Sequence, residues 1–130
     1  MQRFIPYLSY DDAKAAIDFL TEAFGFEERS RYPMDDGRIG HCEMALGGAA
    51  LYLASAYPEM GFNGPGAFDG VHSQVYVQVD DVDGHHARAR DAGATIAAPP
   101  VEEHGTRMYR AVDLEGRRWI FASPTPPEAE

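Results

Sequence analysis

Two short segments, LYLAS (51–55) and WIFAS (119–123), close the two halves of this chain, and their likeness decides how it folds. They lie 68 residues apart, and other landmarks recur at the same spacing: Gly25 and Gly93, Gly37 and Gly105, Gly48 and Gly116, Ser55 and Ser123. Near the start of each half the spacing is 69, which relates Tyr7 to Tyr76, Asp11 to Asp80 and Asp12 to Asp81. Seven landmarks in order indicate an internal duplication.

Each half has the pattern of a strand, a helix and three further strands. Residues 3–10 and 73–80 are rich in Tyr, Val and Ile, as strands are. The aspartates that follow can cap a helix, and in the first half an apolar stripe at helical spacing runs to Gly25, which stops it. Three strands are then expected at 26–33, 38–46 and 49–55, and again at 94–101, 106–113 and 117–123.

The predicted architecture is an α+β fold of two tandem βαβββ modules, about 3–55 and 72–123, within one domain that spans 1–130. Their curved mixed sheets are expected to surround a central cleft, with the helices on the outside. Residues 56–71 are expected to form a crossover loop, because residues 56–70 hold four Gly and two Pro. The segment is too long for a tight turn and long enough to cover a site. Residues 124–130 are expected to be a tail.

Composition excludes several function classes. The net charge of −10 argues against nucleic-acid binding, which depends on clustered Lys and Arg. No stretch approaches the roughly 20 apolar residues of a membrane span, and the N-terminus lacks the pattern of a signal peptide. The single cysteine, Cys42, excludes an intramolecular disulfide and fits the reducing cytoplasm, where we expect the protein to be located.

Strand alternation sorts the side chains onto two faces of each sheet. Val75, Val77 and Val79 belong on the helix side, as do Cys42 and Trp119, which are expected to be core residues. The 68-residue offset makes Tyr109 the counterpart of His41 in the second half. The face away from the helices is then expected to hold Tyr7, Ser9, His41, Glu43, Tyr52, Gln74, Tyr76, Gln78, Tyr109 and Arg118. Such a face is either exposed to solvent or lines a ligand groove with convergent polar groups.

The duplicated unit resembles the vicinal oxygen chelate superfamily, which includes glyoxalase I, extradiol dioxygenases and bleomycin-type resistance proteins. The segments that carry the resemblance are PYLSYDDAKAAIDFLTEAFGFEE (6–28), DGRIGHCEMALGG (36–48), VYVQVDDVDGHHARARDAGAT (75–95) and YRAVDLEGRRWIFASP (109–124). They cover most of the chain apart from the middle loop and the tail. Such a likeness implies the fold but does not choose among the activities of the family.

The resemblance also implies where a metal would be bound. Metalloenzymes of this family hold it with four symmetric positions on the first and last strands of each module, which fall here at Ile5, Tyr52, Gln74 and Ile120. A divalent metal prefers imidazole or carboxylate ligands, and two isoleucines supply none. We therefore expect no metal and no other cofactor.

His41 and Glu43 are two residues apart on one strand and point the same way. They could form an acid–base pair, but a hydrogen bond that lines the cleft and orients a ligand is the favoured interpretation. His85 and His86 are expected on a solvated helix face, and Asp80 and Asp81 are explained by helix capping.

The resemblance to the bleomycin-resistance branch implies a metal-free binding protein, expected to be a homodimer, that sequesters a planar aromatic or cationic natural product or drug. The residues expected to bind the ligand are Tyr7, His41, Glu43, Tyr52, Gln74, Tyr76, Tyr109 and Arg118, and no catalytic residue is assigned. The alternative is a divergent metalloenzyme of the glyoxalase or dioxygenase type that uses His41, Glu43 and His72. A metal-free catalyst based on His41 and Glu43 is a third option, so the sequence leaves enzyme activity open.

Overall fold

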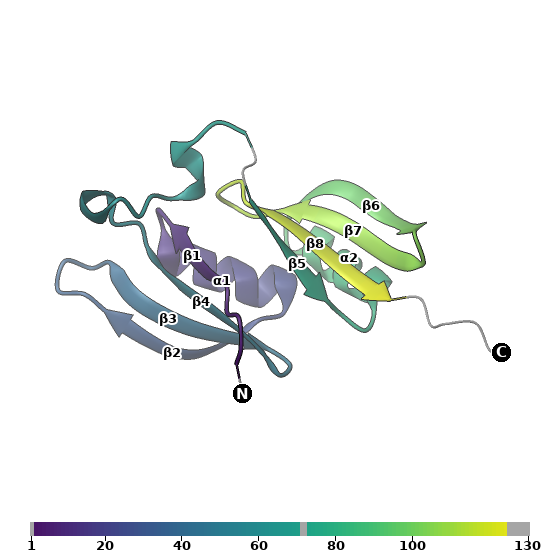
Figure 1. Cartoon of the computed structure of the whole chain (residues 1–130), viewed down its shortest axis with the longest axis horizontal. Coiled ribbons are helices and arrows are strands. Elements are labelled where there is room, and N and C mark those ends of the chain that lie inside the picture. Colours follow the sequence, from purple (N-terminus) through teal and green to yellow (C-terminus); the bar gives the residue numbers. More distant parts are fainter. Residues whose placement is uncertain (1, 71–72, 125–130) are drawn as a thin grey trace. The chain divides into compact units, whose positions relative to one another are not determined.

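The computed structural model describes residues 2–70 and 73–124, and the chain forms two compact units, 1–70 and 71–130. The first unit contains β1 (Tyr7–Tyr10), α1 (Ala13–Phe24), β2 (Glu27–Pro33), β3 (Ile39–Leu46) and β4 (Ala49–Ser55), as Figure 1 shows. Its sheet has the order β1-β4-β3-β2, and β1 is parallel to β4 while the other neighbours are antiparallel. Two single turns of 3-10 helix, η1 (Pro58–Met60) and η2 (Pro65–Ala67), follow β4.

The second unit repeats this arrangement with β5 (Gln74–Gln78), α2 (Val82–Asp91), β6 (Thr95–Glu103), β7 (Thr106–Val112) and β8 (Arg118–Pro124). Its sheet has the order β5-β8-β7-β6, again with one parallel pair, β5 and β8. The structure thus confirms the predicted α+β fold of two βαβββ modules with mixed sheets. That the modules form one domain around a central cleft stays a prediction.

Both helices begin as the sequence predicts. The Asp12 carboxylate accepts a hydrogen bond from the Ala15 N–H at 3.1 Å, and Asp81 accepts one from the Gly84 N–H at 3.0 Å. Each satisfies one of the backbone donors left free at a helix start. At the other end of α1, Gly25 has a φ of 82°, in the left-handed region that glycine adopts without strain, and this ends the helix.

The core of the first unit lies between α1 and one face of its sheet. The buried helix positions recur three and four residues apart, which places them on one face of α1: Ala13, Ala16, Ile17, Leu20, Ala23 and Phe24. The sheet contributes Cys42, Met44, Leu51 and Leu53, each at most 2% exposed. Burying a large apolar side chain contributes roughly 1.5–3 kcal/mol, so this interface stabilises the unit and leaves the opposite sheet face available.

The second unit is centred on Trp119, which is fully buried, as predicted. Its ring stacks on Phe121 with centroids 5.9 Å apart. Its indole N–H donates to the Asp113 carboxylate at 3.0 Å, and this carboxylate also accepts from the N–H groups of Glu115 and Arg117. Asp113 is 5% exposed, so one buried acid satisfies the tryptophan and shapes the loop between β7 and β8.

The predicted position of Tyr109 is wrong. Tyr109 is fully buried on the helix side, where its ring stacks on Phe121 and its hydroxyl lies 2.6 Å from His85 Nδ1. The cause is hairpin length: Met44 pairs with Leu51, seven residues later, whereas Ala111 pairs with Trp119, eight residues later. One added residue shifts the repeat from 68 to 67 in β7 and exchanges the faces of its side chains.

Two smaller predictions also change. His85 does not lie on a solvated face, because its ring packs 4.1 Å from the Phe121 ring as well as bonding Tyr109. The first strand begins at Tyr7 rather than at residue 3, because only residues 7–10 pair with β4 and Pro6 has no N–H to donate.

Some predictions fall outside the described residues: His72, the end of the crossover loop at 71, and residues 125–130 of the tail. Residue 124 belongs to β8. Within the described ranges, neither helix has the length and apolar character that crossing a membrane requires.

Replacing Asp113 by alanine should destabilise the protein by about 2–3 kcal/mol, because it leaves the buried Trp119 N–H and two loop N–H groups without their acceptor. Urea denaturation followed by tryptophan fluorescence measures this. Asp91→Ala is the control, because Asp91 is exposed and, in the described part of the chain, forms its ion pair with its neighbour Arg90. It should change stability by less than about 0.5 kcal/mol. Equal effects of the two variants would contradict the role given to Asp113.

The Cys42 thiol should be inert in the folded protein. It is fully buried on the helix side of β3, and burial raises the pKa of Cys42 to about 11. We expect a thiol reagent at pH 8 to label the folded protein at least about a hundred times more slowly than the urea-unfolded protein. The stabilisation from the neutral thiol should be present below pH 9 and lost as the pH rises toward 11. Rapid labelling of the folded protein would contradict this sheet orientation.

Candidate functional site

Three aromatic rings meet on the face of the first sheet that points away from α1. Register places Tyr7 beside Tyr52, and Glu43 beside Tyr52 on the other side. The His41 ring lies 5.4 Å from the Tyr7 ring and 5.0 Å from the Tyr52 ring, measured between centroids. Four of the residues predicted to bind ligand are thus brought together on one surface: Tyr7, His41, Glu43 and Tyr52. Whether they bind a ligand stays a prediction.

A hydrogen-bonded chain runs through this surface. The Tyr7 hydroxyl lies 2.6 Å from His41 Nδ1, and His41 Nε2 lies 3.0 Å from Glu43 Oε2. Burial raises the pKa of Tyr7, and the nearby Glu43 carboxylate raises it further, so the phenol carries its proton at neutral pH. His41 and Glu43 are hydrogen-bonded to each other, and the chain extends to Tyr7. That it orients a ligand stays a prediction.

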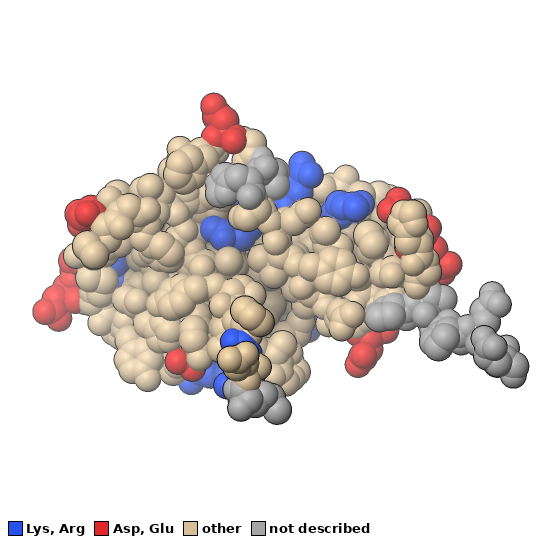
Figure 2. Space-filling view, in the orientation of Figure 1, with Lys and Arg blue, Asp and Glu red and all other residues tan. Residues whose placement is uncertain are grey.

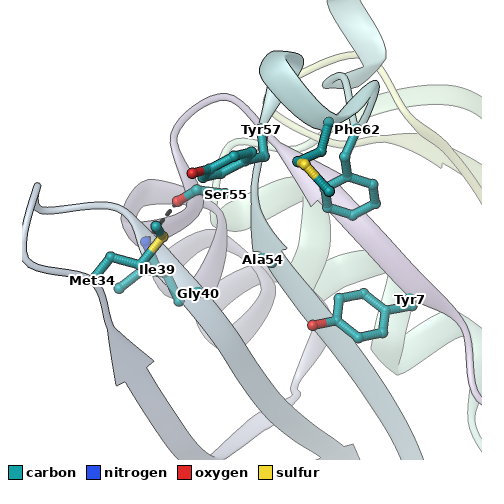
Figure 3. A pocket seen from close by; sticks show the side chains of 9 residues that line it. Tyr7, Met34, Ile39, Gly40, Ala54, Ser55, Tyr57 and Phe62 are labelled. Atoms are coloured by element: carbon teal, nitrogen blue, oxygen red, sulfur yellow. Dashed lines mark hydrogen bonds between the residues drawn. The ribbon is translucent and has the colours of Figure 1, made fainter.

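A pocket of about 700 Å³ adjoins this surface, within the first unit (Figure 3). Its walls come from β1, β3 and β4 and from the segment 57–62 that follows β4. The lining is largely apolar, with hydroxyl groups from Tyr7, Ser55 and Tyr57. The lining residues are Tyr7, Met34, Ile39, Gly40, Ala54, Ser55, Tyr57, Met60 and Phe62. Figure 3 shows Tyr7 at one edge of the pocket and Tyr57 at another. An apolar cavity with few polar groups is typical of a small-molecule site.

The loop wall of the pocket is held by Arg38. The guanidinium lies 4.1 Å from the centroid of the Tyr57 ring, and the same group pairs with Asp36 at 2.7 Å and Glu59 at 3.4 Å. Tyr57 and Phe62 exchange two backbone hydrogen bonds, which close the turn that contains η1.

A second attachment lies further along the loop. The Ser9 hydroxyl donates to the Asn63 carbonyl. A Cβ at position 64 would lie 2.6 Å from an Asp11 carboxylate oxygen and 3.1 Å from the Asp11 backbone nitrogen, so a larger residue there would displace Asp11. Ser9 lies on the sheet face away from α1, where it was expected, but it is buried because the loop covers it.

The pocket residues Met34, Tyr57, Met60 and Phe62 were missed in the sequence. Loop residues have no periodic pattern that would assign them a direction. The available signal was the density of aromatic and methionine side chains between Tyr57 and Phe62, which is unusual for a solvated connection.

Of the other predicted residues, Gln74, Tyr76 and Arg118 lie on the face of the second sheet that points away from α2, whereas Tyr109 lies on the opposite face. Gln74 pairs with Arg118, and Tyr76 with Ile120, so these four side chains share one face. Tyr76 is 52% exposed. Arg110 and Met108 take the places on β7 that Tyr109 and Ala111 were expected to occupy.

The residues at the positions implied for a metal do not fit one. Ile5 and Ile120 end in hydrocarbon, and Ile120 is 9% exposed. Throughout residues 2–70 and 73–124, no three His, Cys, Asp or Glu side chains are grouped as a metal site would require. His41 and Glu43 have Tyr7 as their third partner, and a phenol that keeps its proton is a poor metal ligand.

Charge is dispersed over the visible surface. In Figure 2, acidic side chains of the described residues stand in separate small groups with basic side chains between them.

Comparisons with known proteins agree with this fold. Residues 5–123 match the model of the Glyoxalase/Bleomycin resistance protein/Dioxygenase superfamily. An uncharacterized protein of Mycobacterium bovis is 32% identical over 123 residues, which cover 92% of this chain and 81% of that protein. The crystal structure of TioX from Micromonospora sp. ML1 has a TM-score of 0.76 and 32% identity, covering 95% of this chain and 99% of that chain. TnmS3, an antibiotic binding protein from Streptomyces sp. CB03234, has a TM-score of 0.71 and 25% identity, covering 95% and 96%.

Replacing Arg38 by alanine should loosen the loop wall, because it removes the cation on the Tyr57 ring and the partner of Glu59. A cation–π contact contributes about 0.5–1 kcal/mol at an exposed site, so hydrogen exchange at the Tyr57 and Phe62 amides should become about two- to fivefold faster. Amide-resolved hydrogen exchange measures this. Arg31→Ala is the control, since Arg31 pairs with Glu28 on β2 and not with the loop. Unchanged exchange in Arg38→Ala would contradict the attachment.

Proposed function

Because the chain belongs to the glyoxalase/bleomycin resistance protein/dioxygenase superfamily, we propose that it is a metal-free binding protein that sequesters a planar aromatic or cationic natural product or drug. The observation that carries the proposal is the pocket of about 700 Å³ beside the aromatic surface of Tyr7, His41 and Tyr52. Apolar walls with ring faces at the edge suit a flat ligand that stacks and loses little entropy on binding.

Two further observations support it. TnmS3, to which the chain is similar along nearly its whole length, is an antibiotic binding protein. At the positions where family metalloenzymes hold their metal, Ile5 and Ile120 leave half of a coordination sphere without ligands. Binding without chemistry needs no such ligands, so the isoleucines at these positions are compatible with the proposed function.

We also propose that the protein acts as a homodimer in the cytoplasm. The described residues expose several large side chains that a partner could cover, Tyr32, Tyr76 and Val101 among them. The buried free thiol of Cys42 is compatible with a reducing compartment.

The proposal predicts that proflavine, a planar cationic aromatic, binds the protein with a Kd below about one millimolar. Fluorescence titration and a thermal shift measure this. Tyr7→Leu and Phe62→Leu each remove one ring while keeping an apolar side chain, and each should weaken binding about two- to tenfold, the range expected for one aromatic contact. Phe4→Leu is the matched control, because Phe4 is fully exposed and does not line the pocket.

Two results would contradict the proposal. One is the absence of binding among planar aromatic and cationic compounds, together with no gain in drug tolerance by cells that express the protein. The other is stoichiometric Fe, Ni, Zn or Mn in the purified protein that is lost in the double variant His41→Ala/Glu43→Ala, which would instead support the metalloenzyme alternative.

A further inference from the structure

Tyr7 offers a polar contact at the edge of the pocket. The direction of its hydroxyl hydrogen is determined by two further residues, His41 and Glu43. Its ring lines the pocket (Figure 3), and its hydroxyl lies 2.6 Å from Nδ1 of His41 on β3. Tyr7 is 46% exposed, so a molecule in the pocket can reach the phenol oxygen from the open side. What that oxygen offers a ligand depends on where its own hydrogen is directed.

The chain of hydrogen bonds fixes that direction. The Glu43 carboxylate can only accept, so the hydrogen between it and His41 resides on Nε2. In a neutral imidazole one nitrogen then remains, Nδ1, and it carries a lone pair. At 2.6 Å from Nδ1, the Tyr7 hydroxyl must be the donor of this second bond.

It follows that the Tyr7 oxygen faces the pocket with its lone pairs, because its hydrogen is committed to His41. The negative charge of Glu43, two bonds along the chain, strengthens this acceptor character. A ligand carbonyl or ether oxygen at this place would meet another acceptor, whereas a phenol O–H or an N–H would find a partner.

We propose that Tyr7 determines specificity as an obligate acceptor, so that the site selects planar aromatic ligands that present an O–H or N–H donor and disfavours analogues that present only a carbonyl oxygen. This inference rests on the proposed function and names the ligand class of the same pocket. His41 and Glu43 are positioning residues, because they act through Tyr7.

The test compares two naphthalene probes of similar size, 2-naphthol as the donor and 2-acetylnaphthalene as the carbonyl acceptor. Calorimetric titration at pH 8 should give 2-naphthol an advantage of about tenfold in Kd. In Tyr7→Phe that ratio should fall to near one, because the phenol oxygen is gone while the ring remains.

Glu43→Gln tests the positioning residues. A glutamine amide can donate as well as accept, so His41 can place its hydrogen on Nδ1 and the Tyr7 hydroxyl becomes free to donate to the pocket. The advantage of 2-naphthol should shrink about three- to tenfold, through tighter binding of 2-acetylnaphthalene rather than through a loss of all binding. Glu27→Gln makes the same charge change at an exposed residue of β2 that pairs with Arg29, and it should leave the ratio unchanged.

The outcomes separate the two proposals. If proflavine binds the wild-type protein but neither naphthalene probe does, only this inference fails. If proflavine does not bind either while thermal unfolding is normal, the proposed function fails and this inference fails with it. If both probes bind equally well, the pocket binds aromatics but Tyr7 does not select donors, and only this inference is overturned. A Glu43→Gln variant that keeps the full tenfold ratio would show that the hydrogen-bonded chain does not set the polarity of Tyr7.

Discussion

Strand alternation is the constraint on which the site depends, because neighbouring residues of one strand must point to opposite faces of its sheet. In the first unit the parallel pairing of β1 with β4 and the antiparallel pairing of β4 with β3 converge on Tyr52, with Tyr7 on one side and Glu43 on the other. The same registers send Cys42 and Leu53 to the helix. The core and the aromatic surface are therefore two results of one set of backbone hydrogen bonds, and neither can be changed independently by shifting a strand.

The pocket adds a second element, which the sheet alone would not provide. A flat sheet face buries little of a small molecule unless another segment forms a wall next to it. Here the segment after β4 forms that wall. Arg38 links the two, since it extends from the start of β3 to Tyr57 and Glu59 of the segment. The wall is held by exposed interactions of modest strength, whereas the sheet floor rests on a buried core, so the two sides of the pocket differ in how easily they can adapt.

The sequence predicts the fold well because the pattern of strands, helix caps and glycines occurs twice, so each half supports the assignment made for the other. Both helix caps, the end of α1 at Gly25 and seven of the eight strand positions agree with the structure within about two residues. The candidate site is predicted in part. Tyr7, His41, Glu43 and Tyr52 follow from alternation alone, but Tyr109 does not, because its place was carried over by an offset that a longer hairpin had changed. The loop residues Tyr57 and Phe62 could not be assigned, since no periodicity applies where no regular element exists.

The added residue between β7 and β8 has a consequence for how the two copies of the module have diverged. After the duplication each half could have carried an equivalent set of side chains, and the protein would then have presented two matching recognition points. Because the β7–β8 hairpin is one residue longer than the β3–β4 hairpin, Met108 and Arg110 occupy the places of His41 and Glu43, and Tyr109 packs inside on Phe121. This difference of one residue breaks the pseudosymmetry: the first copy has the polar chain, and the second has a buried aromatic residue that contributes to its core.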